Sequence, residues 1–199
     1  MPRPRAFDRD AALDRAVTEF WRHGYEATSV ASLTAAMGIR PPSLYAAFGD
    51  KRRLFDEAVA RYQRTHGAFT ARALAEEPTA RRAVERVLRE AAVEYSDPAH
   101  PPGCMVVSAA TNCGPESAEV ETSLRDLRER SKQAIVSRIR EDVAAGRLPP
   151  GTDAEGLGAF YAATIQGMSR QAQDGATAKE LLRIAELAMA AWPTTSDQG

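Results

Sequence analysis

Apolar side chains recur every three to four residues along most of the chain, and this spacing predicts amphipathic α-helices. In the first such stretch the apolar positions are Leu13, Ala16, Val17, Phe20, Trp21 and Gly24. No segment shows the strict alternation of apolar and polar residues that predicts a half-buried strand. The pattern therefore predicts an all-α protein.

About nine helices are expected, separated by turns and by loops rich in proline and glycine. The expected segments run from residue 8 to a stop at 23–25, and over about 29–37, 41–48, 51–74, 84–95, 104–112, 117–145, 154–173 and 176–192. The last six residues are expected to fray.

Residues typical of helix ends support the boundaries in the first third of the chain. Asp8 is a suitable N-cap for the first helix, and Asp50 for the fourth. Gly38 follows the second helix at the position where a left-handed C-cap favours glycine. Pro41 and Pro42 suit the first turn of a third helix, where a missing N–H costs nothing.

Composition adds little beyond a globular class, because 44% hydrophobic and 27% charged residues are ordinary values for a chain with a buried core. The formal net charge of -1 hides an asymmetry. Residues 1–64 carry 11 Lys and Arg against 8 Asp and Glu, and the remainder carries 15 against 19. A mildly basic first third suits a polyanionic partner, although solvated helix faces often show so small a bias.

Several classes of protein are disfavoured. No apolar run approaches the roughly 18 residues needed to span a bilayer, and the N-terminus has no apolar core typical of a secretory signal. We therefore expect a cytoplasmic protein with no membrane partner. Cys104 and Cys113 do not form a Cys-x-x-Cys pair and the three histidines are scattered, so neither a metal site, a disulfide framework nor a cofactor is expected.

Enzyme signatures are also missing from the sequence. It contains no nucleophile elbow, P-loop, Rossmann fingerprint, His-Glu-x-x-His or Glu-x-x-His pair. The chain is not expected to be an enzyme. A helical module that binds only other proteins remains the alternative to a DNA-binding protein.

The second and third expected helices are short and joined by a tight turn at Gly38. Two such helices packed on a preceding helix form a helix-turn-helix, whose second helix enters the DNA major groove. The residues alone predict a helical protein with this motif.

The run TSVASLTAAMGIRPPSLYAAFGDKRRLF, residues 28–55, resembles the signature of the TetR/AcrR family of bacterial transcriptional regulators. The positions that fit are Thr28, Gly38, Ile39, Leu44, Tyr45, Phe48, Lys51 and Leu54. The resemblance covers the first quarter to third of the chain, and the expected helix count agrees with the family.

The resemblance implies a DNA-binding domain over residues 1–50, a connecting helix over 51–75, and a ligand-binding and dimerisation domain over 76–199. It also implies a homodimer on operator DNA, most often a repressor, released by a small-molecule effector. In such proteins the last two helices form a four-helix interface with those of the second copy. Small residues in 156–167 and 185–191 would let these helices approach closely.

Three residues are carried over from the family motif as phosphate contacts. The hydroxyls of Thr28 and Tyr45 can donate to phosphate oxygens near a helix N-terminus. Thr28 has N-capping as its structural alternative, and Tyr45 has packing against the first helix. Lys51 begins the fourth helix, where a cation is unfavourable unless an anion lies close. Arg52 and Arg53 are further candidates, with a solvated surface role as the alternative.

The front of the third helix holds Arg40, Pro41, Pro42 and Ser43. Arg40 is the only long donor there, so we expect it to read guanine O6 and N7. The prolines offer apolar contact to a thymine methyl, or serve only to start the helix. Arg3 and Arg5 form a short arm that can lie in the minor groove, or a tail with incidental charge.

Candidates for an apolar ligand cavity in the second half of the chain are Tyr95, Met105, Phe160, Tyr161, Ile165 and Met168. Each residue alone is as well explained by ordinary core packing. Cys104 is expected to begin a helix, a location that lowers a thiol pKa. Two interpretations of Cys104 and Cys113 remain open. The two residues sense redox conditions, or they are ordinary thiols without such a role.

Overall fold

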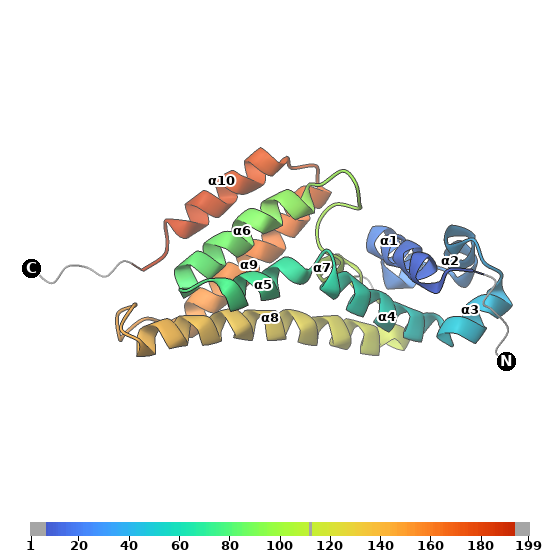
Figure 1. Ribbon diagram of the computed structural model, residues 1–199, viewed down its shortest axis with the longest axis horizontal. Helices are drawn as coiled ribbons and strands as arrows, with labels where there is room; N and C mark the ends of the chain where they lie inside the picture. Colours follow the sequence, from blue (N-terminus) through green and yellow to red (C-terminus); the bar gives the residue numbers. More distant parts are fainter. Residues whose placement is uncertain (1–6, 112, 194–199) are drawn as a thin grey trace, which may run out of the picture. The chain divides into compact units, whose positions relative to one another are not determined.

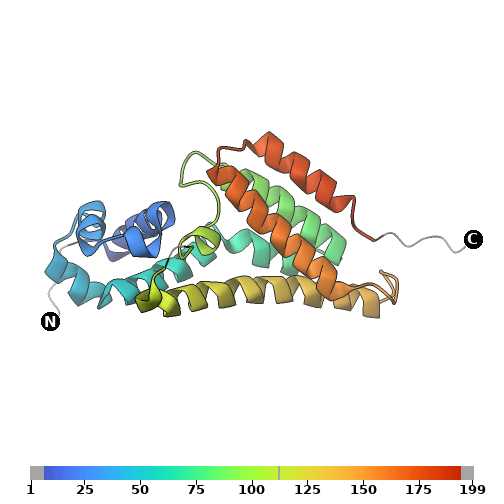
Figure 2. The same ribbon diagram turned by 180° about the vertical axis from the view of Figure 1, so that it is seen from behind.

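The computed structural model describes residues 7–111 and 113–193, and within these ranges it is helical without strands. The described residues form ten α-helices and one short 3-10 helix, and Figures 1 and 2 show how the helices run within the chain. They are α1 (Arg9–Ala27), α2 (Val30–Met37), α3 (Pro41–Phe48), α4 (Lys51–Arg64), α5 (Ala68–Glu76), α6 (Ala80–Tyr95), α7 (Met105–Ser108), η1 (Pro115–Ser117), α8 (Ala118–Ala144), α9 (Ala154–Gln173) and α10 (Ala178–Met189). The predicted all-α class is confirmed.

The count differs from nine because the helix expected over 51–74 is two helices. The chain leaves helical geometry at Thr65, where φ is -113° and ψ is -95°, and α5 begins at Ala68. Gly67 allows this turn to close tightly, since a Cβ there would lie 3.0 Å from the Tyr62 ring. Its N–H donates to the carbonyl oxygen of Tyr62 at 2.8 Å. The apolar periodicity of the sequence continues through this break, so the pattern did not indicate that the helix ends there.

The expected stop at residues 23–25 corresponds to a local departure from the helix at Gly24. Its φ of 78° lies in the left-handed region that favours glycine. A Cβ at Gly24 would also approach the carbonyl oxygen of Ala109 to 3.2 Å. The neighbouring Tyr25 N–H donates to that oxygen at 2.8 Å, which ties the end of α1 to the residues after α7.

The chain divides into two compact units that are not continuous in sequence. The first unit comprises residues 1–67 and 104–124, and the second comprises 68–103 and 125–199. Helix α8 begins in the first unit and continues in the second. By packing, the segment 104–124 thus belongs with the N-terminal helices, whereas the predicted ligand-binding domain over 76–199 included it.

The first unit has an aromatic core between α1 and α4. Phe20 and Trp21 of α1 are buried, and they meet Phe55 and Tyr62 of α4 edge-on at ring distances of 5.0 and 4.8 Å. Such edge-on pairs contribute about 0.5–1.5 kcal/mol beyond the burial of their area. This core is the support on which the short helices α2 and α3 rest.

In the second unit, α6 packs against both α9 and α10, and the three helices lie side by side in Figures 1 and 2. The inward face of α6 is a continuous apolar stripe of Ala83, Val84, Val87, Leu88, Ala91 and Ala92. Gly158 of α9 approaches α8 so closely that a Cβ would lie 2.3 Å from a methyl group of Val136. The small residue is required there by packing within the chain.

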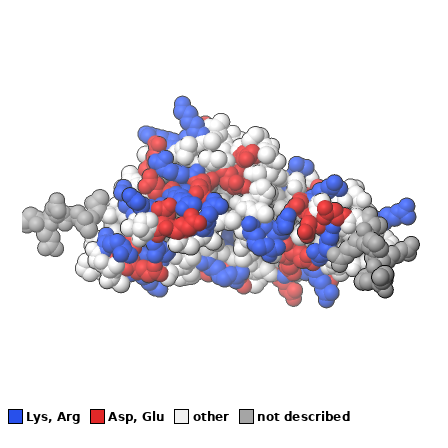
Figure 3. All heavy atoms as spheres, viewed as in Figure 1, with Lys and Arg blue, Asp and Glu red and all other residues white. Residues whose placement is uncertain are grey.

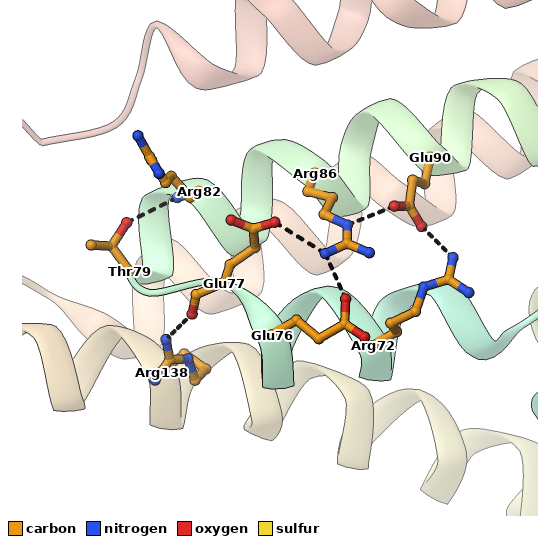
Figure 4. A network of polar contacts seen from close by, with 8 residues as sticks. All are labelled: Arg72, Glu76, Glu77, Thr79, Arg82, Arg86, Glu90 and Arg138. Carbon is orange, nitrogen blue, oxygen red and sulfur yellow. Dashed lines mark hydrogen bonds and ion pairs between the residues drawn. The ribbon is translucent and has the colours of Figure 1, made fainter.

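A network of ion pairs on the surface of the second unit joins α5 to α6 (Figure 4). Arg86 lies 2.6 Å from Glu90, 2.9 Å from Glu76 and 3.0 Å from Glu77. Arg72 also pairs with Glu90. These contacts and the nearby Arg86 guanidinium keep the pKa of Glu90 below its usual range, although burial opposes them and is the largest single influence. A network of this kind is worth more than isolated surface pairs.

A buried carboxylate holds the start of α6. Asp142 of α8, 2% exposed, accepts a hydrogen bond from the backbone N–H of Ala80 at 2.8 Å and pairs with Arg147 at 2.8 Å. The carboxylate thereby satisfies one of the N–H groups that a helix start leaves unpaired. None of the helices in the described ranges is long and apolar enough to cross a membrane.

Candidate nucleic-acid interface

The helix-turn-helix geometry depends on the two capped ends of α2. Ser29 caps α2 in a reciprocal pair with Ser32, so Ser29 is the N-cap and the neighbouring Thr28 is not. Gly38 ends α2 with φ 68° and ψ 31°, as predicted, and the Ile39 N–H returns to the carbonyl of Thr34 at 3.0 Å. This turn redirects the chain into α3 within three residues.

Helix α3 has one buried and one exposed face. Leu44 and Phe48 are buried, whereas Arg40, Pro41, Pro42 and Tyr45 are exposed and Ser43 is half-buried. Tyr45 retains 51% of its surface, so the alternative that it packs against α1 does not describe this structure. The two prolines occupy the first two positions of α3, as expected. They have no N–H, so the first turn presents ring carbons and the Arg40 side chain rather than a set of backbone donors.

Lys51 begins α4, next to the N-cap Asp50, which accepts from the N–H of Arg53 at 2.8 Å. Its ammonium nitrogen lies 4.2 Å from the centre of the Tyr25 ring, a cation–π contact that the sequence did not predict. Burial lowers the pKa of Lys51, while Glu26 acts in the opposite direction. The contact holds the ammonium group of Lys51 against the Tyr25 ring at the end of α1.

Thr28 is 1% exposed, and its hydroxyl donates to the carbonyl oxygen of Gly24 at 2.5 Å. The proton of this hydroxyl is therefore already engaged at the end of α1. The phosphate contact expected of Thr28 remains a prediction. Arg3 and Arg5 lie outside the described residues.

The neighbouring arginines of α4 differ in their contacts. Arg52 donates to both carboxylate oxygens of Asp56 at 3.1 Å and to the hydroxyl of Ser123 at 2.9 Å. The Arg53 side chain is 75% exposed, and its ion pair with Asp50 is long, at 3.8 Å. Arg53 is therefore the better candidate for an additional phosphate contact. On the face shown in Figure 3, basic and acidic side chains are interspersed rather than gathered into one large patch.

The residues expected to line a ligand cavity fall in different environments. Tyr95 and Met105 are buried, but Met105 belongs to the first unit and the other five candidates to the second. Tyr161 is also buried, and its hydroxyl donates to the carbonyl of Ala188 at 3.2 Å. Met168 is buried and Ile165 is half-buried. Phe160 retains 42% of its surface on the outer face of α9. The assignment of a cavity to these residues remains a prediction.

Both cysteines are half-buried, and no disulfide joins them. Burial raises the pKa of the Cys113 thiol, and Glu26 and Glu121 raise it further. This is the reverse of the lowered pKa that activates a thiolate. Cys104 precedes α7, which is only four residues long, so the helix expected over 104–112 is much shorter than predicted.

A short exposed helix that follows a glycine turn and is anchored from behind by two apolar residues defines a helix-turn-helix DNA-binding protein. The chain belongs to the tetR family of bacterial regulatory proteins. Residues 12–58 match the sequence model of that family, and residues 83–186 match a tetracyclin repressor-like C-terminal domain. It is thus a transcriptional regulator from a family that is not enzymatic.

Relatives of known class support the assignment over nearly the whole chain. The HTH-type transcriptional repressor ComR of Escherichia coli is 35% identical over 96% of this chain and 91% of its own length. The HTH-type transcriptional repressor BdcR of the same organism is 32% identical over 94% of this chain and 89% of its own. One solved structure shows a cysteine-substituted form of the TetR family regulator CifR with a 26-base-pair double-strand operator DNA. That protein is 46% identical to this chain, and the two structures superpose with a TM-score of 0.92. The match covers 96% of this chain and 100% of the CifR chain.

Proposed function

We propose that this chain is a sequence-specific transcriptional repressor that binds a two-half-site operator as a homodimer and is released by a small molecule bound in its second unit. The observation that carries the proposal is the exposed front of α3, where Arg40, Pro41, Pro42 and Tyr45 project while Leu44 and Phe48 hold the helix from behind. A major groove about 12 Å wide accepts one such helix.

The roles within this interface follow from side-chain chemistry. Arg40 is the side chain that reads base edges, because it is the long donor at the front of α3. Tyr45, Lys51 and Arg53 contact phosphates and contribute affinity that does not depend on sequence. The prolines give apolar contact to a thymine methyl.

The exposed apolar surface of α9 and α10 supports the dimer. Ala159, Phe160, Ala163 and Gly167 share the outer face of α9, and a Cβ at Gly167 would meet nothing within 4 Å. On α10, Leu187 is 59% exposed. A second copy that covers this surface would place two α3 helices on one duplex, as a two-fold operator requires.

Two further parts of the proposal rest on the family and on the two Escherichia coli repressors that this chain resembles. ComR and BdcR are repressors, which favours repression over activation for this chain. A regulator of bacterial genes acts where the chromosome lies, so we place it in the cytoplasm and assign it no catalytic activity.

The test is selection of an operator from random duplexes and from the region upstream of the chain's own gene, followed by binding titrations at several salt concentrations. We expect affinity for the operator to fall by about 10³ or more between about 50 and 200 mM salt, as counterions are released from neutralised phosphates. Replacement of Tyr45 by Ala or of Lys51 by Met should weaken binding to operator and random duplexes alike. Lys132→Met, which removes a lysine of the second unit, is the control. Absence of any DNA retardation at low salt would favour the helical protein-interaction module instead.

A further inference from the structure

Helix α1 begins with an arginine, although a cation in the first turn of a helix is disfavoured by the helix dipole. Arg9 is not left to solvent, because its side chain is only 25% exposed and contacts two other helices, α3 and α4. These contacts give a reason for an arginine at this position that helix propensity does not.

The first contact is with the end of the recognition helix α3. Nε and Nη2 of Arg9 donate to the carbonyl oxygen of Ala47 at 3.4 and 3.3 Å. The last carbonyls of a helix have no partner within it, and the negative end of its dipole attracts a cation. The guanidinium also lies over the Phe48 ring, 4.3 Å from its centre. Arg9 therefore contacts the last two residues of α3, Ala47 and Phe48.

The second contact fixes the arginine to α4. Nη2 of Arg9 lies 2.8 and 2.6 Å from the two carboxylate oxygens of Glu57, which is itself 39% exposed. The planar guanidinium can satisfy a carboxylate and a carbonyl in one fixed geometry, as a lysine cannot. Arg9 and Glu57, together with the Ala47 carbonyl and the Phe48 ring, thus join α1, α3 and α4. We call this set the Arg9 clamp.

We infer that the Arg9 clamp is a positioning device that sets the orientation of α3 and thereby the selectivity of this protein for its operator over other DNA. The inference rests on the proposed DNA-binding function. Helix α3 has eight residues and buries only Leu44 and Phe48, so its own core contacts leave its angle weakly fixed. A change of angle would shift Arg40 away from a base edge, whereas flexible phosphate contacts would tolerate it.

A different reading is that Arg9 binds a phosphate directly. The two readings make opposite predictions for Glu57→Gln, which removes one negative charge and releases the arginine. If Arg9 served as a phosphate contact, this change would strengthen binding to operator and random duplexes alike. If the clamp positions α3, the ratio of operator affinity to random-duplex affinity should fall by about tenfold, similar to the effect of one mismatched base pair.

The experiment compares the wild-type chain with Glu57→Gln, Arg9→Met and the double variant, each titrated with the selected operator and with a scrambled duplex. We expect both single variants to lower the affinity ratio by a similar factor. The double variant should be no worse than either, because both changes break one device. The salt dependence of random-duplex binding should stay unchanged in Arg9→Met, since the loss of a phosphate contact would reduce its slope by about one.

Asp14→Asn is the matched control. Asp14 pairs with Arg61 at 2.9 Å, so this ion pair also joins α1 to α4 and its loss also removes one negative charge, yet it does not touch α3. The control should keep the wild-type affinity ratio, and thermal melts of all variants report folding separately. An unchanged ratio in Glu57→Gln, or an equal loss in Asp14→Asn, would overturn the clamp. A wild-type chain that selects no operator would instead refute the proposed function.

Discussion

Arg40 and Arg53 are both exposed arginines of the first unit, but they occupy positions with different access to DNA. Arg40 precedes the first turn of α3, and Arg53 lies in the first turn of α4. In the proposed interface, Arg40 would face the bases of the groove that α3 enters, and Arg53 would lie near the DNA backbone. The two arginines would then separate base reading from phosphate contact, although both have the same side chain.

For Arg40→Ala we expect a loss of about 1–3 kcal/mol in operator binding and relaxed preference at one base position. For Arg53→Ala we expect weaker binding to all duplexes and a salt slope reduced by about one. Binding to operators with single base substitutions measures both. An equal loss on specific and random duplexes for Arg40→Ala would place that arginine on a phosphate.

Tyr161 shows how burial changes a residue that sequence offered as a pocket candidate. Its ring is fully buried, lies 5.5 Å from Trp192 and meets Phe160 edge-on at 5.0 Å. Burial raises the pKa of Tyr161 to about 12 from its usual value of 10.0. The folded chain therefore holds the phenolic proton more tightly than the unfolded chain does.

It follows that the stabilisation linked to this proton is present below pH 10 and is lost as the pH rises toward 12. Tyr161→Phe should cost about 0.5–1.5 kcal/mol near neutral pH through the lost bond to the Ala188 carbonyl. Its melting temperature should then fall less steeply than that of the wild type in alkali. Thermal melts between neutral pH and about pH 11 test this, with Tyr45→Phe, at an exposed position, as control. Parallel alkaline declines for wild type and Tyr161→Phe would contradict the assignment.

At the scale of the element, the turn between α2 and α3 depends on the left-handed conformation of Gly38. With φ of 68°, any side chain there is strained, and a Cβ would lie 3.2 Å from a guanidinium nitrogen of Arg15. That guanidinium donates to the carbonyl of Met37 at 3.1 Å, so it is part of the same turn.

Gly38→Ala should destabilise the fold by about 1–2 kcal/mol, the cost of a left-handed conformation for an ordinary residue. It should also weaken operator binding, because α3 starts three residues after Gly38. Chemical denaturation gives the stability change. Gly114→Ala serves as control, since Gly114 has negative φ and open space around its Cβ position. Equal stability of the two variants would show that the turn tolerates a side chain.

At the scale of the whole molecule, the proposed homodimer depends on apolar side chains that are exposed on the surface of a single chain. Two large aliphatic side chains are almost equally exposed: Leu187 of α10 at 59% and Val93 of α6 at 60%. Only Leu187 lies on the two helices proposed for the dimer. Because the two side chains are almost equally exposed, Val93 is a matched control for substitution of Leu187.

Leu187→Glu should convert the dimer to monomer at micromolar concentration and reduce binding to a two-half-site operator, because a charge would be buried at the interface. Val93→Glu should leave the dimer intact. Sedimentation or light scattering after size exclusion measures the mass. A dimer that survives Leu187→Glu, or is lost in Val93→Glu, would move the interface elsewhere.

The sequence by itself determined the features whose physics is local. The helix class follows from apolar periodicity, the turn at Gly38 from the one residue that adopts positive φ without strain, and the start of α3 from two prolines. These signals lie within a few residues of the structure they specify. The family signature in residues 28–55 added the expected function.

Tertiary structure alone decided the contacts between distant parts of the chain. The Arg9 side chain meets Glu57 across 48 residues, and Arg52 meets Ser123 across 71. Packing also determined that Gly158 faces Val136 while Gly167 faces open space, although both belong to one small-residue pattern. Periodicity says which face of a helix is apolar or small, but the partner of that face depends on how the whole chain packs.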